Sequence, residues 1–135
     1  ATALETSGVS AIELSGGTLE SGKMVPARRG SIKPENEGYY KEEARYFKKN
    51  VGIPLILVGG FRTLSVAEQF LQEGICDFIA MARPFICEPD LIMRWKNREQ
   101  NYSSCNSDNL CYLPVQAGKG LYCLTQVRKK TRPQA

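Results

Sequence analysis

The stretch PLILVGGFR, residues 54–62, joins a short apolar run to two glycines and an arginine. The stretch GICDFIAMAR, residues 74–83, follows the same plan, because its apolar run also ends in small residues and an arginine. A third stretch of this kind, GVSAIELSGG, occupies residues 8–17. Continuous apolar runs without strict alternation indicate strands that are buried on both faces of a parallel sheet. The three stretches therefore predict three parallel strands.

Helical patterns occupy the two stretches between the predicted strands and the stretch after the third strand. Residues 39–50 place apolar side chains on one face and carry acidic residues early. Residues 65–73 begin with Ser65 and Glu68, which have the spacing of a helix capping box. Residues 88–99 have a proline near their start and apolar residues at core spacing. Alternating strands and helices predict an α/β fold with right-handed crossovers, either an open doubly wound sheet or a (β/α)8 barrel.

The number of strands bears on how the fold is completed. A (β/α)8 barrel needs eight strands, and three strands alone would expose an apolar edge and face. The chain opens with ALETSG, residues 3–8, which has the pattern of the last turn of a helix. We therefore expect about three βα units of a TIM barrel with flanking helices, completed by a missing N-terminal half or by a second copy in a homo-oligomer.

Composition excludes several classes of protein. The chain has 135 residues, of which 42% are hydrophobic and 24% charged, as in ordinary globular domains. The net charge of +4 is not arranged as a basic stripe interleaved with aromatic residues, so no nucleic-acid partner is predicted. No apolar run approaches the about 20 residues of a membrane span, and we expect a cytoplasmic protein. Histidine, the commonest general base and metal ligand, does not occur.

The ends of the last two predicted strands form a candidate ligand site. Glycine lets the backbone approach a ligand closely, as at Gly59 and Gly60. Ala82 is also small, and Arg83 can donate two hydrogen bonds to a phosphate. In barrels the common phosphate site lies in the loops after strands seven and eight. The alternatives are a tight Gly-Gly turn and a surface salt bridge of the arginine. A long loop, residues 18–38, also follows a strand end, where barrel active sites lie.

The sequence around the three predicted strands resembles a known family. VGGFRTLSVAEQFLQEGICDFIAMARPFICEPDL, residues 58–91, is similar to the last two βα units of the old yellow enzyme family. IELSGGTLE, residues 12–20, resembles the sixth strand of that family. The match includes the branch of NADH oxidase and 2,4-dienoyl-CoA reductase. The resemblance implies that residues 1–100 form strands six to eight of a (β/α)8 barrel, and that residues 101–135 form a cysteine-containing loop and a basic tail.

The resemblance also implies a function. The family transfers hydride from reduced FMN to an activated alkene, with NADH or NADPH as reductant. Its FMN phosphate would be held by Gly59, Gly60, Ala82 and Arg83, although the family more usually has glycine where Ala82 stands. The family's histidine proton donor lies on an earlier strand, so no catalytic residue is predicted here. We therefore expect the isolated chain to be inactive and to supply only the phosphate-binding loops.

Two other functions remain open from the sequence. One is a non-catalytic flavin- or phosphate-binding half-barrel that dimerises. The other is a different phosphate-binding TIM-barrel enzyme, since the same strand ends bind phosphorylated metabolites in other barrels. Four acidic residues are interpreted as a solvated cluster rather than a catalytic pair: Glu35, Glu37, Glu42 and Glu43.

The cysteines after the barrel motifs are candidate metal ligands. In the dienoyl-CoA reductase branch a C-x2-C-x3-C-x11-C set binds a [4Fe–4S] cluster, which needs four thiolates. Here Cys105, Cys111 and Cys123 have C-x5-C-x11-C spacing, and Tyr102 stands in place of the first cysteine. A cluster or a three-cysteine zinc site is therefore not expected, and we interpret these residues as reduced thiols. The sequence assigns no role to Cys87.

Overall fold

A computed structural model describes residues 1–18, 20–22 and 25–131 of the chain. Three strands form one parallel sheet in the order β1-β2-β3: β1 is Ile12–Leu14, β2 is Leu55–Val58 and β3 is Phe78–Ala80. Leu14 pairs with Leu57, and Val58 pairs with Ala80. The predicted α/β class with three parallel strands is therefore confirmed, and the arrangement matches part of a (β/α)8 barrel.

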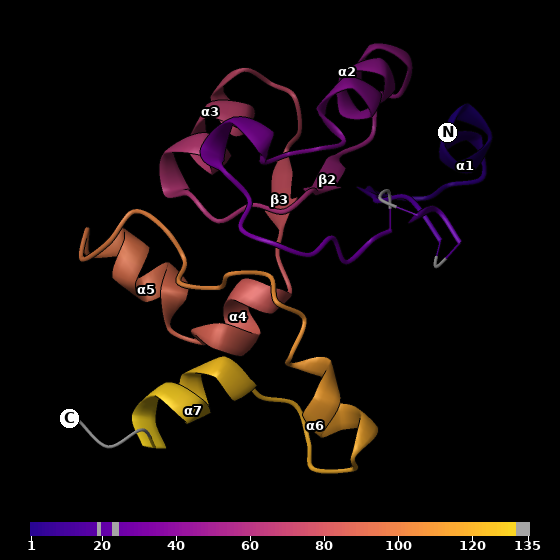
Figure 1. The fold of residues 1–135 in the computed structure, drawn as a ribbon. Coiled ribbons are helices and arrows are strands. Elements are labelled where there is room, and N and C mark those ends of the chain that lie inside the picture. Colours follow the sequence, from indigo (N-terminus) through magenta and orange to yellow (C-terminus); the bar gives the residue numbers. More distant parts are fainter. Residues whose placement is uncertain (19, 23–24, 132–135) are drawn as a thin grey trace.

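Helices precede, separate and follow the strands. They are α1 (Thr2–Thr6), η2 (Pro34–Asn36), α2 (Lys41–Asn50), α3 (Leu64–Gln72), α4 (Arg83–Cys87), α5 (Leu91–Lys96), α6 (Tyr112–Gln116) and α7 (Leu124–Thr131). Figure 1 shows α2 and α3 beside the sheet, whereas α4 to α7 gather beyond the carboxyl end of β3. None of the helices in the described ranges is long and apolar enough to cross a membrane.

The hydrophobic core lies between one face of the sheet and the helices α2 and α3. Leu55 and Leu57 of β2 point into it, whereas the alternate residues Ile56 and Val58 are only half-buried. The prediction that the strands are buried on both faces is therefore wrong for the described residues. One helical layer covers one face, and side chains alternate between the two faces of a strand. The core residues are Tyr40, Ala44, Leu55, Leu57, Phe61, Ala67, Phe70, Ile75 and Cys76.

Helix α3 begins differently from the sequence prediction. Ser65 was predicted as its cap, but the helix starts at Leu64 and Thr63 occupies the cap position. The Glu37 carboxylate accepts hydrogen bonds from the backbone N–H of Arg62 and of Thr63, at 2.9 and 3.0 Å. It also accepts one from the Thr63 hydroxyl, at 2.6 Å. A distant carboxylate thus satisfies donors at this helix start, which a local capping box would otherwise do.

The position of Glu37 corrects a second interpretation. Its side chain is buried, with a relative exposure of 5%, so it does not belong to a solvated acidic cluster. Its neighbours Glu35, Glu42 and Glu43 are exposed, as interpreted. Burial of a charged group is tolerated only when hydrogen bonds replace water, and the three donors at the start of α3 do so.

Candidate functional site

A cavity of about 160 Å³ lies at the carboxyl ends of β2 and β3. Gly60, Ala82 and Arg83 line it, so the structure brings together three of the four residues predicted to bind a phosphate. Gly59 is not among the lining residues. Its carbonyl accepts hydrogen bonds from the backbone N–H of Gly38 and of Tyr39, at 2.7 and 3.2 Å. The other lining residues are Pro26, Ala27, Tyr39, Val58, Phe61, Arg62, Ala80, Met81, Pro84 and Tyr112.

Gly60 has a conformation and surroundings that require glycine. Its φ is +78°, in the left-handed region that side chains disfavour. A Cβ atom here would lie 2.7 Å from both the Ile32 Cδ1 and the Tyr39 ring. The second glycine of the LVGGFR stretch is therefore fixed by this close approach of Ile32 and Tyr39, whatever ligand occupies the cavity.

Arg83 is buried at the cavity, and its guanidinium is oriented by two acceptors. Its Nη1 donates to the Asn109 Oδ1 at 2.6 Å and to the backbone carbonyl of Arg28 at 2.8 Å. Asn109 in turn donates from Nδ2 to the carbonyl of Ala27 at 2.8 Å. A residue of the C-terminal segment thus connects the arginine to the long loop after β1. Nothing in the local sequence around Asn109 distinguishes it, so this residue could not be predicted as part of the site.

Part of the long loop after β1 lies against the cavity. The Arg28 guanidinium carbon lies 3.7 Å from the centroid of the Tyr39 ring, a cation–π contact. The Tyr39 hydroxyl donates to the carbonyl of Pro26 at 3.1 Å. Pro26 and Ala27 themselves line the cavity. These contacts hold this part of the loop at the carboxyl ends of the strands.

Arg62 is a second buried arginine at the cavity, and each of its three guanidinium nitrogens donates to a protein acceptor. Nε donates to the carbonyl of Cys105 at 3.2 Å, Nη1 to that of Phe61 at 2.6 Å, and Nη2 to the Ser107 hydroxyl at 3.0 Å. Burial lowers the pKa of Arg62, and the nearby charge of Arg83 lowers it further, whereas Cys105 and Glu37 raise it. Two neighbouring positive charges make the cavity favourable for an anion.

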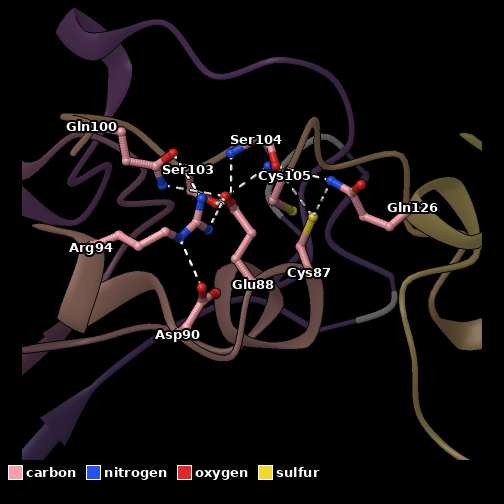
Figure 2. Close-up of polar contacts among 9 residues, drawn as sticks. All are labelled: Cys87, Glu88, Asp90, Arg94, Gln100, Ser103, Ser104, Cys105 and Gln126. Atoms are coloured by element: carbon pink, nitrogen blue, oxygen red, sulfur yellow. Dashed lines mark hydrogen bonds and ion pairs between the residues drawn. The ribbon is translucent and has the colours of Figure 1, made fainter. Parts of the chain in front are cut away.

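Glu88, which follows α4, holds the segment after α5 in place (Figure 2). Its carboxylate accepts hydrogen bonds at 2.6 Å from the Ser103 hydroxyl, the Ser104 backbone N–H and the Arg94 guanidinium. Gln100 Nε2 donates a longer one at 3.3 Å. Burial raises the pKa of Glu88, but the hydrogen bonds from Ser103, Arg94, Gln100 and Ser104 outweigh it and leave the pKa lower than 4.5.

Substitution Glu88→Gln is expected to lower the free energy of unfolding at pH 7 by about 1–2 kcal/mol, because a charge-assisted acceptor is lost. The folded-state pKa is depressed, so the contribution is present above pH 4.5 and disappears as the pH falls through the lowered pKa. Urea unfolding at a series of pH values should therefore show a smaller loss on acidification for the variant.

The matched control for this prediction is Asp90→Asn. Asp90 also pairs with Arg94, at 3.1 Å, but its side chain is 65% exposed. Exposed pairs contribute about 0–1 kcal/mol, so this variant should unfold nearly as the unmodified chain does. Equal stability of Glu88→Gln and the unmodified chain at pH 7 would show that the network has no net stabilising effect.

The three candidate metal-ligating cysteines are not assembled into one site. Within residues 1–18, 20–22 and 25–131, no group of three or more His, Cys, Asp or Glu side chains is arranged to hold a metal ion. The carbonyl of Cys105 accepts from Arg62, and Cys111 is buried. Cys123 lies directly before α7, in the region of Cys87.

Contacts around the site cross the predicted boundary at residue 100. The backbone N–H of Leu64 donates to the carbonyl of Asn101 at 2.7 Å, and that of Ser103 donates to the carbonyl of Arg62 at 2.7 Å. Thr63 and Tyr102 form an isolated antiparallel bridge. The segment after α5 therefore helps to build the loop between β2 and α3.

The chain is thus an α/β protein with parallel strands and an arginine-lined cavity at their carboxyl ends, the place where proteins of this class commonly bind ligands. The sequence model of the NADH:flavin oxidoreductase / NADH oxidase family matches residues 9–101. The chain belongs to this family, which confirms the resemblance found in the sequence.

Curated relatives agree with the family. The NADH-dependent flavin oxidoreductase iccE of Talaromyces variabilis is 37% identical over 87 residues, which is 61% of this chain and 21% of the relative. A metal reductase of Desulforamulus reducens is 40% identical over 89 residues, 66% of this chain and 13% of the relative. The NADH oxidase of Thermoanaerobacter brockii is 34% identical over 108 residues, 79% of this chain and 16% of the relative. The chain thus spans about a fifth or less of the length of these relatives.

Proposed function

We propose that this chain provides the phosphate-binding part of an FMN site in an NADH-dependent oxidoreductase of the ene-reductase type. The observation that carries the proposal is Arg83, buried and oriented by Asn109 in a basic cavity at the carboxyl ends of two parallel strands. Family membership supports flavin as the ligand. The names of the relatives above support NADH as the reductant.

The size of the cavity fits one end of the cofactor. Pockets for whole small-molecule ligands measure roughly 300–1,000 Å³, whereas this cavity measures about 160 Å³. That is room for a phosphate group and not for a flavin ring. Arg83 would bind the phosphate through charge-assisted hydrogen bonds, and the small residues Gly60 and Ala82 would let the backbone approach it.

The residues present indicate which part of the reaction this chain supports and which part FMN supplies. When bound, FMN supplies hydride transfer, and the protein supplies position and polarity. This chain contributes no histidine as a proton donor. We therefore expect no reduction of an activated alkene by this chain alone, and a role limited to holding the phosphate end.

The test is a pair of titrations followed by flavin fluorescence, one with FMN and one with riboflavin, which lacks the phosphate. FMN should bind more tightly, and Arg83→Ala should weaken FMN binding about 10- to 100-fold, the loss expected for hydrogen bonds to a charged group. Riboflavin binding should be unchanged. Arg83→Lys, which keeps the charge but cannot donate in a bidentate manner, should lie between the two.

The control variant is Lys49→Ala, which removes the same charge from an exposed position of α2. It should bind FMN as the unmodified chain does. Equal affinity for FMN and riboflavin, with the fold intact by circular dichroism, would contradict the proposal. Displacement of FMN by simple sugar phosphates at equal concentration would favour a different phosphate-binding barrel enzyme.

A further inference from the structure

Cys87 and Cys123 come from elements far apart in the sequence and meet beside the Glu88 network. Cys87 is the last residue of α4, and Cys123 directly precedes α7. Gln126 of α7 donates from Nε2 to the Cys87 Sγ at 3.4 Å and to the Ser104 hydroxyl at 3.0 Å (Figure 2). The Cys87 Sγ and the Ser104 Oγ are 3.7 Å apart. The first turn of α7 is thus docked onto the end of α4.

Cys123 lies at the start of this same first turn of α7. The backbone N–H of Val127 donates to the carbonyl of Cys123 at 3.2 Å, so the helical turn closes on Cys123. Cys123 is at the position before α7 and Gln126 is the third residue of the helix, two positions whose side chains can reach each other. Because Gln126 contacts Cys87, this places Cys123 near Cys87 as well. Burial raises the pKa of the Cys87 thiol most, hydrogen bonds from Gln126 and Ser104 lower it, and the nearby Cys123 thiol raises it further.

We propose that Cys87 and Cys123 form a reversible intramolecular disulfide when the chain meets a low-molecular-weight disulfide such as oxidised glutathione. The Cys123 thiolate attacks one sulfur of glutathione disulfide and releases one glutathione thiolate. The Cys87 thiolate then attacks the resulting mixed disulfide at the Cys123 sulfur and releases the second. Two protein thiols are oxidised to one disulfide and one glutathione disulfide is reduced to two thiols. The two protons lost by the protein thiols pass through solvent to the two released glutathione thiolates.

The surroundings of Cys76 and Cys111 explain why neither is expected to take part in this disulfide. Cys76 is 2% exposed, and burial raises its pKa to about 11, so it is neither accessible nor ionised at neutral pH. Cys111 is also buried. Cys87 and Cys123 are both half-buried, so a small oxidant can reach them. The contact of Gln126 with Cys87 keeps the start of α7 beside α4.

The disulfide would act on the element that carries the cavity arginine. Helix α4 has Arg83 at its first position and Cys87 at its last. A bond from Cys87 to Cys123 would tether α7 to this helix covalently, where hydrogen bonds of Gln126 hold it in the reduced chain. The redox state of the pair would therefore control how firmly the C-terminal helix is attached beside the candidate phosphate site.

The test incubates the full chain in glutathione buffers of increasing oxidation, blocks free thiols by alkylation, and maps disulfides by mass spectrometry. Cleavage before Asp77 and Asp90 separates Cys87 from Cys76 and Cys105, and cleavage after Lys119 separates Cys123 from Cys111. We expect one internal disulfide that joins the Cys87 peptide to the Cys123 peptide and is removed by a thiol reductant. Either Cys87→Ser or Cys123→Ser should abolish it.

The control variant is Cys105→Ser, which should leave the disulfide unchanged. Because the readout is a bond and not activity, it does not depend on flavin binding. A disulfide between Cys105 and Cys111, a disulfide only between separate chains, or complete alkylation of both thiols in every buffer would each overturn the proposal. Circular dichroism of the serine variants checks that a missing bond does not reflect unfolding.

Discussion

Gly38→Ala is expected to lower the free energy of unfolding by about 3 kcal/mol, from two separate effects. Gly38 has a φ of +62°, and a side chain in this left-handed conformation costs about 1–2 kcal/mol. A Cβ atom at this position would lie 2.3 Å from the ring of Phe70, which packs edge-on against Phe61 at 5.1 Å. The ring cannot move freely, because it belongs to the core beneath α3. Overpacking of this kind costs about 1–3 kcal/mol.

Gly74→Ala separates the two effects and is the matched control. Gly74 has nearly the same φ, +65°, but no atom within 4 Å of the Cβ position. It should cost only the conformational part, about 1–2 kcal/mol. Denaturant unfolding of both variants gives the packing effect as a difference. If the two variants were equally destabilised, the contact between the loop before α2 and the Phe70 ring would be loose.

The strands and the residues at their ends could be predicted because their signals are local. The glycines and small residues that bound β2 and β3 lie within a few positions of the apolar runs, and the structure places Gly60, Ala82 and Arg83 at one cavity. The strand period was harder to read. Residues 55–58 are all apolar, so the sequence does not show that only Leu55 and Leu57 face the core.

The supporting residues could not be predicted, because each acts far from its own position in the sequence. Glu37 binds Thr63, 26 residues away, and Asn109 binds Arg83, again 26 residues away. A carboxylate near several others in a loop has the pattern of a solvated cluster, and only the fold shows that it is buried. The capping prediction at Ser65 failed for the same reason, since the acceptor for the start of α3 comes from another loop.

These long-range contacts converge on the ends of β2 and β3. Glu37 binds the backbone N–H groups of Arg62 and Thr63. The Arg62 guanidinium in turn binds Cys105 and Ser107. Asn109 lies two residues beyond Ser107 and orients Arg83. The buried carboxylate and the candidate phosphate-binding arginine are therefore linked by a set of contacts, in which hydrogen bonds reach residues 105–107 and the backbone continues from there to Asn109. Disturbing its first member should affect both stability and binding.

Glu37→Ala is accordingly expected to have the largest effect of any single substitution considered, a loss of about 3–5 kcal/mol in the free energy of unfolding. Two backbone N–H groups and one hydroxyl would lose their acceptor, and an unsatisfied buried donor costs about 1–3 kcal/mol. Glu37→Gln keeps one acceptor oxygen and should cost less, about 1–2 kcal/mol. Denaturant unfolding measures both, and hydrogen exchange at the Arg62 and Thr63 amides should be faster in the alanine variant.

Glu43→Ala is the control for this prediction, because Glu43 is an exposed glutamate of α2 a short distance along the chain. Exposed substitutions usually change stability by no more than about 0.5 kcal/mol. The Glu37→Gln variant also tests whether Glu37 affects FMN binding, because this variant should remain folded. If Glu37 positions the cavity through Arg62 and residues 105–109, Glu37→Gln should weaken FMN binding while leaving riboflavin binding unchanged. Loss of stability with unaltered FMN binding would instead confine Glu37 to holding the start of α3.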